Sequence, residues 1–170
     1  MTLKLTNFVA LFLLALVAGV FWGTWFTLTR SIETFSPAEF IHIGKTIIAN
    51  VAWPMRILMP ACILFMFLSA WLYPEKKSPA FFLNVAACLL IIVALLITVL
   101  VEVPIDNQIK TWTAETIPSD WRAIRERWQC FHTARTFASL ASFASLAVAI
   151  IFPKSKNKLR RTRNEIHDSG

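Results

Sequence analysis

Four long apolar stretches take up most of the chain. Each is continuously apolar over roughly the 20 residues that a helix needs to cross a bilayer, and they cover residues 8–28, 54–73, 80–101 and 131–152. Strands of a membrane barrel would instead alternate apolar and polar residues over about ten positions. The pattern therefore predicts an all-α fold, a four-helix transmembrane bundle.

The first stretch resembles a signal peptide in having Lys4 before an apolar run. However, the run continues through Trp22 and Phe26, and no A-x-A cleavage pattern follows it. These features favour a helix that is retained in the mature protein.

Two polar segments between the apolar stretches also carry helix signals. Ser36 is a good N-cap, with Pro37 at the first helical position and Glu39 placed for a capping box. We expect an additional interfacial helix from there to about Asn50, and a second membrane helix that starts kinked or late because of its prolines. A further helix start signal lies at residues 119–122, and no helix breaker follows it before residue 153. This predicts a fourth helix that extends beyond the membrane.

The composition agrees with a membrane protein. Of the 170 residues, 56% are hydrophobic and only 16% are charged, which leaves too little polar surface to cover a soluble domain of this length. We expect one membrane domain over residues 1–153, followed by a basic, disordered tail over residues 154–170.

The basic residues are concentrated in that tail and predict the topology. Four spans put both termini on one side, together with Lys4 and the Lys76–Lys77 turn. Because positive charge in short loops and tails marks the cytoplasmic side, both termini are predicted to be cytoplasmic. The tail is expected to contact anionic lipid headgroups, whereas a nucleic-acid partner is not expected, because no stacking aromatic residues accompany the basic run.

One face of the fourth stretch carries the most chemistry. It is formed by residues spaced three or four apart, which share a helix face: Trp128, His132, Arg135, Ser139 and Ser142. An ionisable group in a span is costly unless it faces the bundle interior and finds a partner. A Glu102–Arg135 or an Asp106–Arg127 ion pair would supply one. Such pairs are also used only to fix helix geometry, so a structural role stays open.

A metal site is an alternative. Glu39 and His42 form one E-x-x-H pair, whereas bundle di-iron sites use two such motifs. Glu102 and Asp106, or a haem held by two histidines, would complete a site. We expect no cofactor, with a metal ion or haem as the alternative.

Six of the seven tryptophans fall on the predicted outer side: Trp22, Trp25, Trp53, Trp112, Trp121 and Trp128. An aromatic belt at the membrane interface accounts for some of them without any function. Several also crowd around charged groups, which indicates a polar, tryptophan-lined pocket that opens outward. We expect the helix over residues 37–50 to close this pocket.

The segment from Val103-Pro104-Ile105-Asp106-Asn107-Gln108 through Trp112 and Arg127-Trp128 to His132-Thr133-Ala134-Arg135-Thr136 resembles the anthrone oxygenase-like family. Most of its members are bacterial, which implies a multi-pass protein of the bacterial inner membrane. The family's fungal members oxidise anthrones with molecular oxygen and no evident bound cofactor.

The resemblance implies that His132 is a catalytic base, with Arg135 and Asn107 stabilising an oxyanion. The substrate pocket would be lined by Trp22, Trp25, Trp112, Trp128 and Arg127. Glu102 and Asp106 depart from the family pattern, and two carboxylates favour a cationic ligand or metal over an anionic substrate.

We therefore expect an oxygenase-like oxidoreductase that acts on a lipophilic small molecule, aromatic by the resemblance. Two alternatives stay open. In the first, the protein is a small non-catalytic subunit of a homo-oligomer or larger membrane complex. In the second, it binds a lipid or small molecule in the same pocket.

Overall fold

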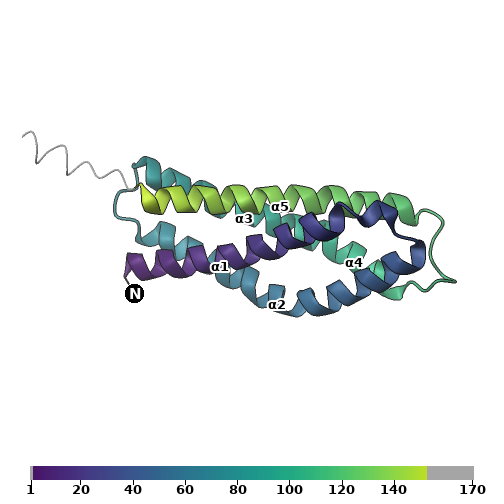
Figure 1. Cartoon of the computed structure of the whole chain (residues 1–170). Coiled ribbons are helices and arrows are strands. Elements are labelled where there is room, and N and C mark those ends of the chain that lie inside the picture. Colours follow the sequence, from purple (N-terminus) through teal and green to yellow (C-terminus); the bar gives the residue numbers. More distant parts are fainter. Residues whose placement is uncertain (1, 153–170) are drawn as a thin grey trace, which may run out of the picture.

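The computed structural model describes residues 2–152, so the predicted basic tail over residues 154–170 lies outside the described residues. Within them the chain forms helices and no strand (Figure 1). The five α-helices are α1 (Leu3–Thr24), α2 (Pro37–Leu72), α3 (Pro79–Ile97), α4 (Val103–Thr111) and α5 (Trp121–Ile151).

Four continuous helical runs are long and apolar enough to cross a membrane: Leu3–Thr34, Pro37–Leu72, Pro79–Thr111 and Trp121–Ile151. Large apolar side chains such as Phe8, Phe67, Leu89 and Phe137 point outward from them. Outward-facing apolar residues are expected where lipid replaces water. The predicted all-α bundle of four membrane-length helices is thereby confirmed.

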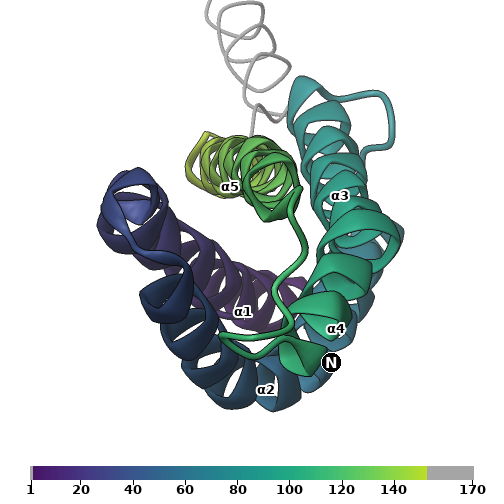
Figure 2. The ribbon, with the colours of Figure 1, turned by 90° about the vertical axis from the view of Figure 1, so that its right-hand side faces the viewer.

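The four long helices pack as a closed ring, in which α2 contacts α1 and α3, and α5 contacts α3 and α1. Figure 1 shows the start of α1 and the end of α5 at one end of the bundle, with the longer connections at the other. Seen along the helices in Figure 2, α1, α2 and the α3–α4 run form an arc, and α5 lies against its open side. We call the end with the longer connections the outer end.

The helix that begins after Ser36 starts as predicted. Ser36 accepts a hydrogen bond from the Glu39 amide, and the Glu39 carboxylate accepts one from the Ser36 amide. It does not end near Asn50, however, because α2 continues through Pro54 and Pro60 to Leu72. The separate interfacial helix is thus the outer part of the second membrane helix. A proline in a helix removes one backbone hydrogen bond and bends the axis, and Figure 1 shows α2 as a bent helix.

The third helix also runs further than predicted. A π-helical turn over Thr98–Glu102 connects α3 to α4, so the chain stays helical beyond residue 101, where the third apolar stretch ends, as far as Thr111. A π turn holds more residues than an α turn and changes which side chains face a neighbouring helix. Here Thr98 and Glu102 both face α5, where each contacts Arg135.

Candidate functional site

A cavity of about 360 Å³ lies within the outer half of the bundle and is lined by residues of α1, α2, α3, α4 and α5. Five residues singled out from the sequence line it together: Asp106, Asn107, Trp128, His132 and Arg135. Ser139 and Ser142, which follow on the same side of α5, are buried as well. The prediction that this side of α5 faces the interior of the bundle is therefore confirmed.

His132 is held between aromatic rings. Its imidazole stacks on the indole of Trp128, with the ring centroids 4.8 Å apart and the planes 4° from parallel. Phe21 of α1 meets it edge to face, at a centroid distance of 6.3 Å. With 1% of its surface exposed, the imidazole has little freedom to rotate, and its orientation is set by this packing.

Arg135 connects His132 to α3. Its Nε donates to Nδ1 of His132 at 3.2 Å, and its Nη2 lies 2.8 Å from the same nitrogen. Its Nη1 donates to the hydroxyl of Thr98 at 3.1 Å. The guanidinium also lies over the ring of Phe21, 4.6 Å from the centroid, an arrangement that favours a cation.

Arg135 can only donate hydrogen bonds, so Nδ1 of His132 must present a lone pair to it. The neutral imidazole then carries its proton on Nε2, which has no hydrogen-bond partner among the described residues. In this state His132 is a donor on its Nε2 side. To take up a proton on Nδ1, it would first have to release Arg135.

Glu102 is the counter-ion of Arg135. Its Oε2 lies 3.0 Å from Nη2 of Arg135, and its side chain is fully buried. The predicted Glu102–Arg135 pair is thus present. The predicted Asp106–Arg127 pair is not among the ion pairs of the described residues. Arg127 is exposed and lies over the ring of Phe131 instead.

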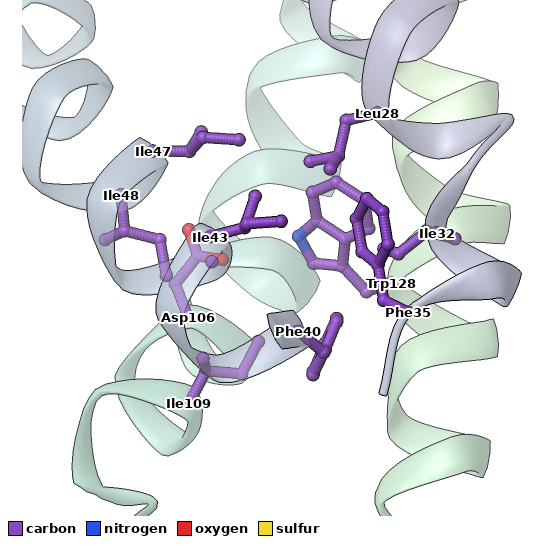
Figure 3. A pocket seen from close by; sticks show the side chains of 11 residues that line it. Leu28, Ile32, Phe35, Phe40, Ile43, Ile47, Ile48, Asp106, Ile109 and Trp128 are labelled. Carbon is purple, nitrogen blue, oxygen red and sulfur yellow. The ribbon is translucent and has the colours of Figure 1, made fainter. Parts of the chain in front are cut away.

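Asp106 and Asn107 follow one another on α4 and both line the cavity. The amide oxygen of Asn107 accepts a hydrogen bond of 3.1 Å from Lys110, which leaves its NH₂ group free to donate. Asp106 also borders a second, smaller chamber of about 30 Å³ at the outer end. Figure 3 shows its carboxylate turned toward the indole nitrogen of Trp128, among apolar side chains.

The outer part of α2 closes this smaller chamber. Phe40, Ile43, Gly44 and Ile48 line it from one side and Ile109 from another (Figure 3). Phe40, Ile48 and Ile109 also belong to a buried apolar cluster with Trp121 and Trp128. The chain between Pro37 and Asn50 therefore covers the outer end of the site, as the sequence predicted.

The mouth of the larger cavity lies at the side of the bundle. Its lining residues on α1 and α5 are buried or half-buried, whereas its exposed lining residues all come from α2 and from the α3–α4 run. They are Arg56, Pro60, Val99, Val103, Asn107 and Lys110. The opening thus faces the surface that a bilayer would cover, which suits a ligand dissolved in lipid.

The other predicted pocket residues lie outside this cavity. Trp22 is exposed, and Trp25 donates from its indole to the Thr133 hydroxyl at 3.1 Å, which ties the π-helical turn after α1, Trp25–Thr29, to α5. Trp112 is buried in the outer apolar cluster. Trp128 is the predicted tryptophan that lines the cavity.

The residues of the metal alternative do not come together. Glu39 caps α2 at the surface, and His42 is exposed and absent from the cavity wall. Within residues 2–152 no three or more His, Cys, Asp or Glu side chains are grouped so that they could hold a metal ion. Glu102, in turn, is engaged with Arg135.

Sequence reasoning missed Phe21 and Thr98, which hold Arg135 from two other helices. It also missed Arg56, which lies on the cavity wall. A cation within an apolar stretch is a signal for Arg56. Phe21 and Thr98 carry no such signal, because apolar and hydroxyl residues are common in every span.

The comparison with protein families agrees with the resemblance seen in the sequence. The model of the family described as anthrone oxygenase matches residues 48–145, which is more than half of the chain and includes Asn107, His132 and Arg135. No curated protein and no solved structure matches the chain. The chain belongs to the anthrone oxygenase family.

Proposed function

We propose that this protein oxidises a small lipophilic aromatic substrate with molecular oxygen in the cavity between α2, α4 and α5. The observation that carries the proposal is the cavity itself. It is large enough for part of a ring system, opens at the side of the bundle, and has His132 and Arg135 on its buried wall and Asn107 at its mouth. Apolar walls with a few convergent polar groups are typical of small-molecule sites.

The reaction follows from the family's chemistry. A base removes a proton from the activated ring CH₂, and the charge spreads onto the ring carbonyl as an enolate-like oxyanion. The carbanion transfers electrons to O₂ and forms a C–O bond to it, giving a hydroperoxide once a proton returns. Loss of water then leaves a new carbonyl, so one oxygen atom enters the product and the other leaves as water.

The polar side chains have complementary parts in this reaction. The amide of Asn107 and the Nε2–H of His132 are donors that would stabilise the oxyanion, and Arg135 supplies positive charge behind them. Two groups are candidates for the base. His132 would act through Nδ1 after release of Arg135, and Asp106 would act as a carboxylate that lines the cavity beside Trp128.

We further propose that the substrate reacts with O₂ directly, without a resident metal or haem, and that the protein lies in a bacterial inner membrane with both termini in the cytoplasm. The charge pattern supports this orientation, because Lys4 and the Lys76–Lys77 turn belong to the end opposite the cavity. Binding of anionic lipids by the tail and assembly into an oligomer or larger complex stay predictions.

The test is oxygen uptake and anthraquinone formation from anthrone by the protein purified in mild detergent, corrected for spontaneous oxidation. We expect His132→Gln and Asp106→Asn to lower the rate, at least one of them by about a hundredfold, the usual size of a proton-transfer contribution. His42→Gln is the matched control and should keep the wild-type rate, because His42 is exposed and does not line the cavity.

Full activity in both cavity variants would count against catalysis at this site and favour a structural role for the cluster. Metal content and the absorption spectrum are measured on the same samples. A stoichiometric metal or a haem band that disappears in His132→Gln would overturn the direct reaction with oxygen.

A further inference from the structure

Arg56 is a cation within a membrane-length helix, and no ion pair formed by residues 2–152 neutralises it. It lies on α2, lines the cavity, and is exposed at its mouth. Neither an ion pair nor a side-chain hydrogen bond of Arg56 occurs among residues 2–152. An ionisable side chain in a span is costly and commonly marks a ligand pathway.

Lys110 faces the same mouth from the opposite element. It belongs to α4, lines the cavity, is exposed, and donates to Asn107. Its ammonium therefore adds positive charge next to an amide that can donate hydrogen bonds. Arg56 and Lys110 thus line the cavity from α2 and from the α3–α4 run, which together carry its exposed lining residues.

The balance of charge on the cavity wall is positive. Of the described residues that line it, Arg56, Lys110 and Arg135 are cations and Asp106 is a carboxylate. Arg135 is compensated from behind by Glu102, and Lys110 lies one helical turn from Asp106. Among the described lining residues, Arg56 is left as the charge without a partner.

From these observations we propose that the ligand carries an anionic oxygen group, a carboxylate or a phenolate, and that Arg56 together with Lys110 binds this group at the mouth. The aromatic part of the ligand then points inward toward Trp128 and His132. This inference rests on the proposed function for the aromatic nature of the ligand. It reverses the expectation from sequence that Glu102 and Asp106 favour a cationic ligand.

A lipid phosphate could supply the same chemistry. Trp53, one turn before Arg56, is 67% exposed and is suited to the headgroup region, where arginine side chains extend to reach phosphates. The substrate and the lipid must therefore be separated by experiment.

The experiment measures binding by titration calorimetry of the full chain in dodecyl maltoside, which contains no phosphate, with empty micelles as the blank. The two probes share one ring system: anthraquinone-2-carboxylate and the neutral 2-methylanthraquinone. We expect the wild type to bind the carboxylate about tenfold more tightly than the neutral probe, as one charge-assisted contact would provide.

Arg56→Gln should remove this preference without weakening the neutral probe, Lys110→Gln should reduce it, and Arg56→Lys should retain part of it. Arg122→Gln is the matched control, because Arg122 is exposed on α5 and does not line the cavity. It should bind both probes as the wild type does.

Equal binding of the two probes, unchanged by Arg56→Gln, would overturn the inference while leaving the aromatic site intact. No binding of either probe would overturn both proposals. In a parallel arm, the titrations are repeated in nanodiscs with and without phosphatidylglycerol. If Arg56→Gln changes only thermal stability with that lipid and never the probe preference, then Arg56 serves a headgroup and the inference is wrong.

Discussion

At the scale of single residues, the site depends on one chain of contacts across the bundle. Glu102 holds Arg135 by charge, Arg135 donates to His132, and His132 stacks on Trp128. Each side chain in this chain fixes the orientation of the next. Because neither oxygen of Glu102 has a hydrogen-bond partner among the described residues, its contribution is the charge that it offers to Arg135.

Glu102→Gln keeps the shape of the side chain and removes that charge. We expect a loss of about 3 kcal/mol in the free energy of unfolding, because a buried charge left without its partner is strongly destabilising. Thermal or denaturant unfolding in detergent measures this. Glu126→Gln is the control, since Glu126 is exposed and its pair with Arg125 spans 4.0 Å, and its effect should stay within about 0.5 kcal/mol. An equal effect of the two substitutions would show that Glu102 does not neutralise Arg135.

At the scale of the helices, hydrophobic pattern and capping signals predicted what has a local cause. The four apolar stretches, the start of α2 at Ser36 and the unbroken α5 were all predicted correctly, because each depends on neighbours in sequence. The continuity of α2 through Pro54 and Pro60, and the π turn that aims Thr98 and Glu102 at Arg135, were not. Both features carry a local energetic cost: a lost backbone hydrogen bond at each proline and a strained π turn. The sequence shows this cost, but it does not show the packing between helices that compensates for it. The same limit explains why Trp25 and Trp112 were misplaced in the pocket.

Close packing of α2 on α4 gives a test at this scale. A Cβ atom at Gly44 would lie 3.4 Å from Cγ2 of Ile109, whereas one at Gly19 would have no neighbour within 4 Å. Both glycines are in helices, so leucine gains helix propensity at either position. We expect Gly44→Leu to lower the free energy of unfolding by about 1–3 kcal/mol through overpacking, and Gly19→Leu to leave it unchanged or raise it. Unfolding in detergent measures both, and equal stability of the two variants would contradict the tight contact.

At the scale of the whole molecule, the bundle has two unlike ends. The inner end is held by a polar contact in which Asn84 donates to Ser69 and Ser69 donates to Asn7, joining α3, α2 and α1. The outer end contains the cavity and is closed by the outer part of α2 and by Trp121. A rigid base and a hollow outer half suit a site that receives its ligand sideways from the bilayer, with oxygen soluble in the same lipid.

The orientation of these ends in the membrane is a separate prediction. Cys130, the exposed native cysteine, is first changed to serine. In this background, a single cysteine then replaces either Thr113 in the outer connection or Lys77 in the inner turn. Intact cells are treated with a membrane-impermeant maleimide before and after permeabilisation. If positive charge retains the inner end in the cytoplasm, Thr113→Cys is labelled in intact cells and Lys77→Cys only after permeabilisation. The reverse pattern would place the cavity in the cytoplasmic half of the membrane, and the substrate would then have to be supplied from the inner leaflet.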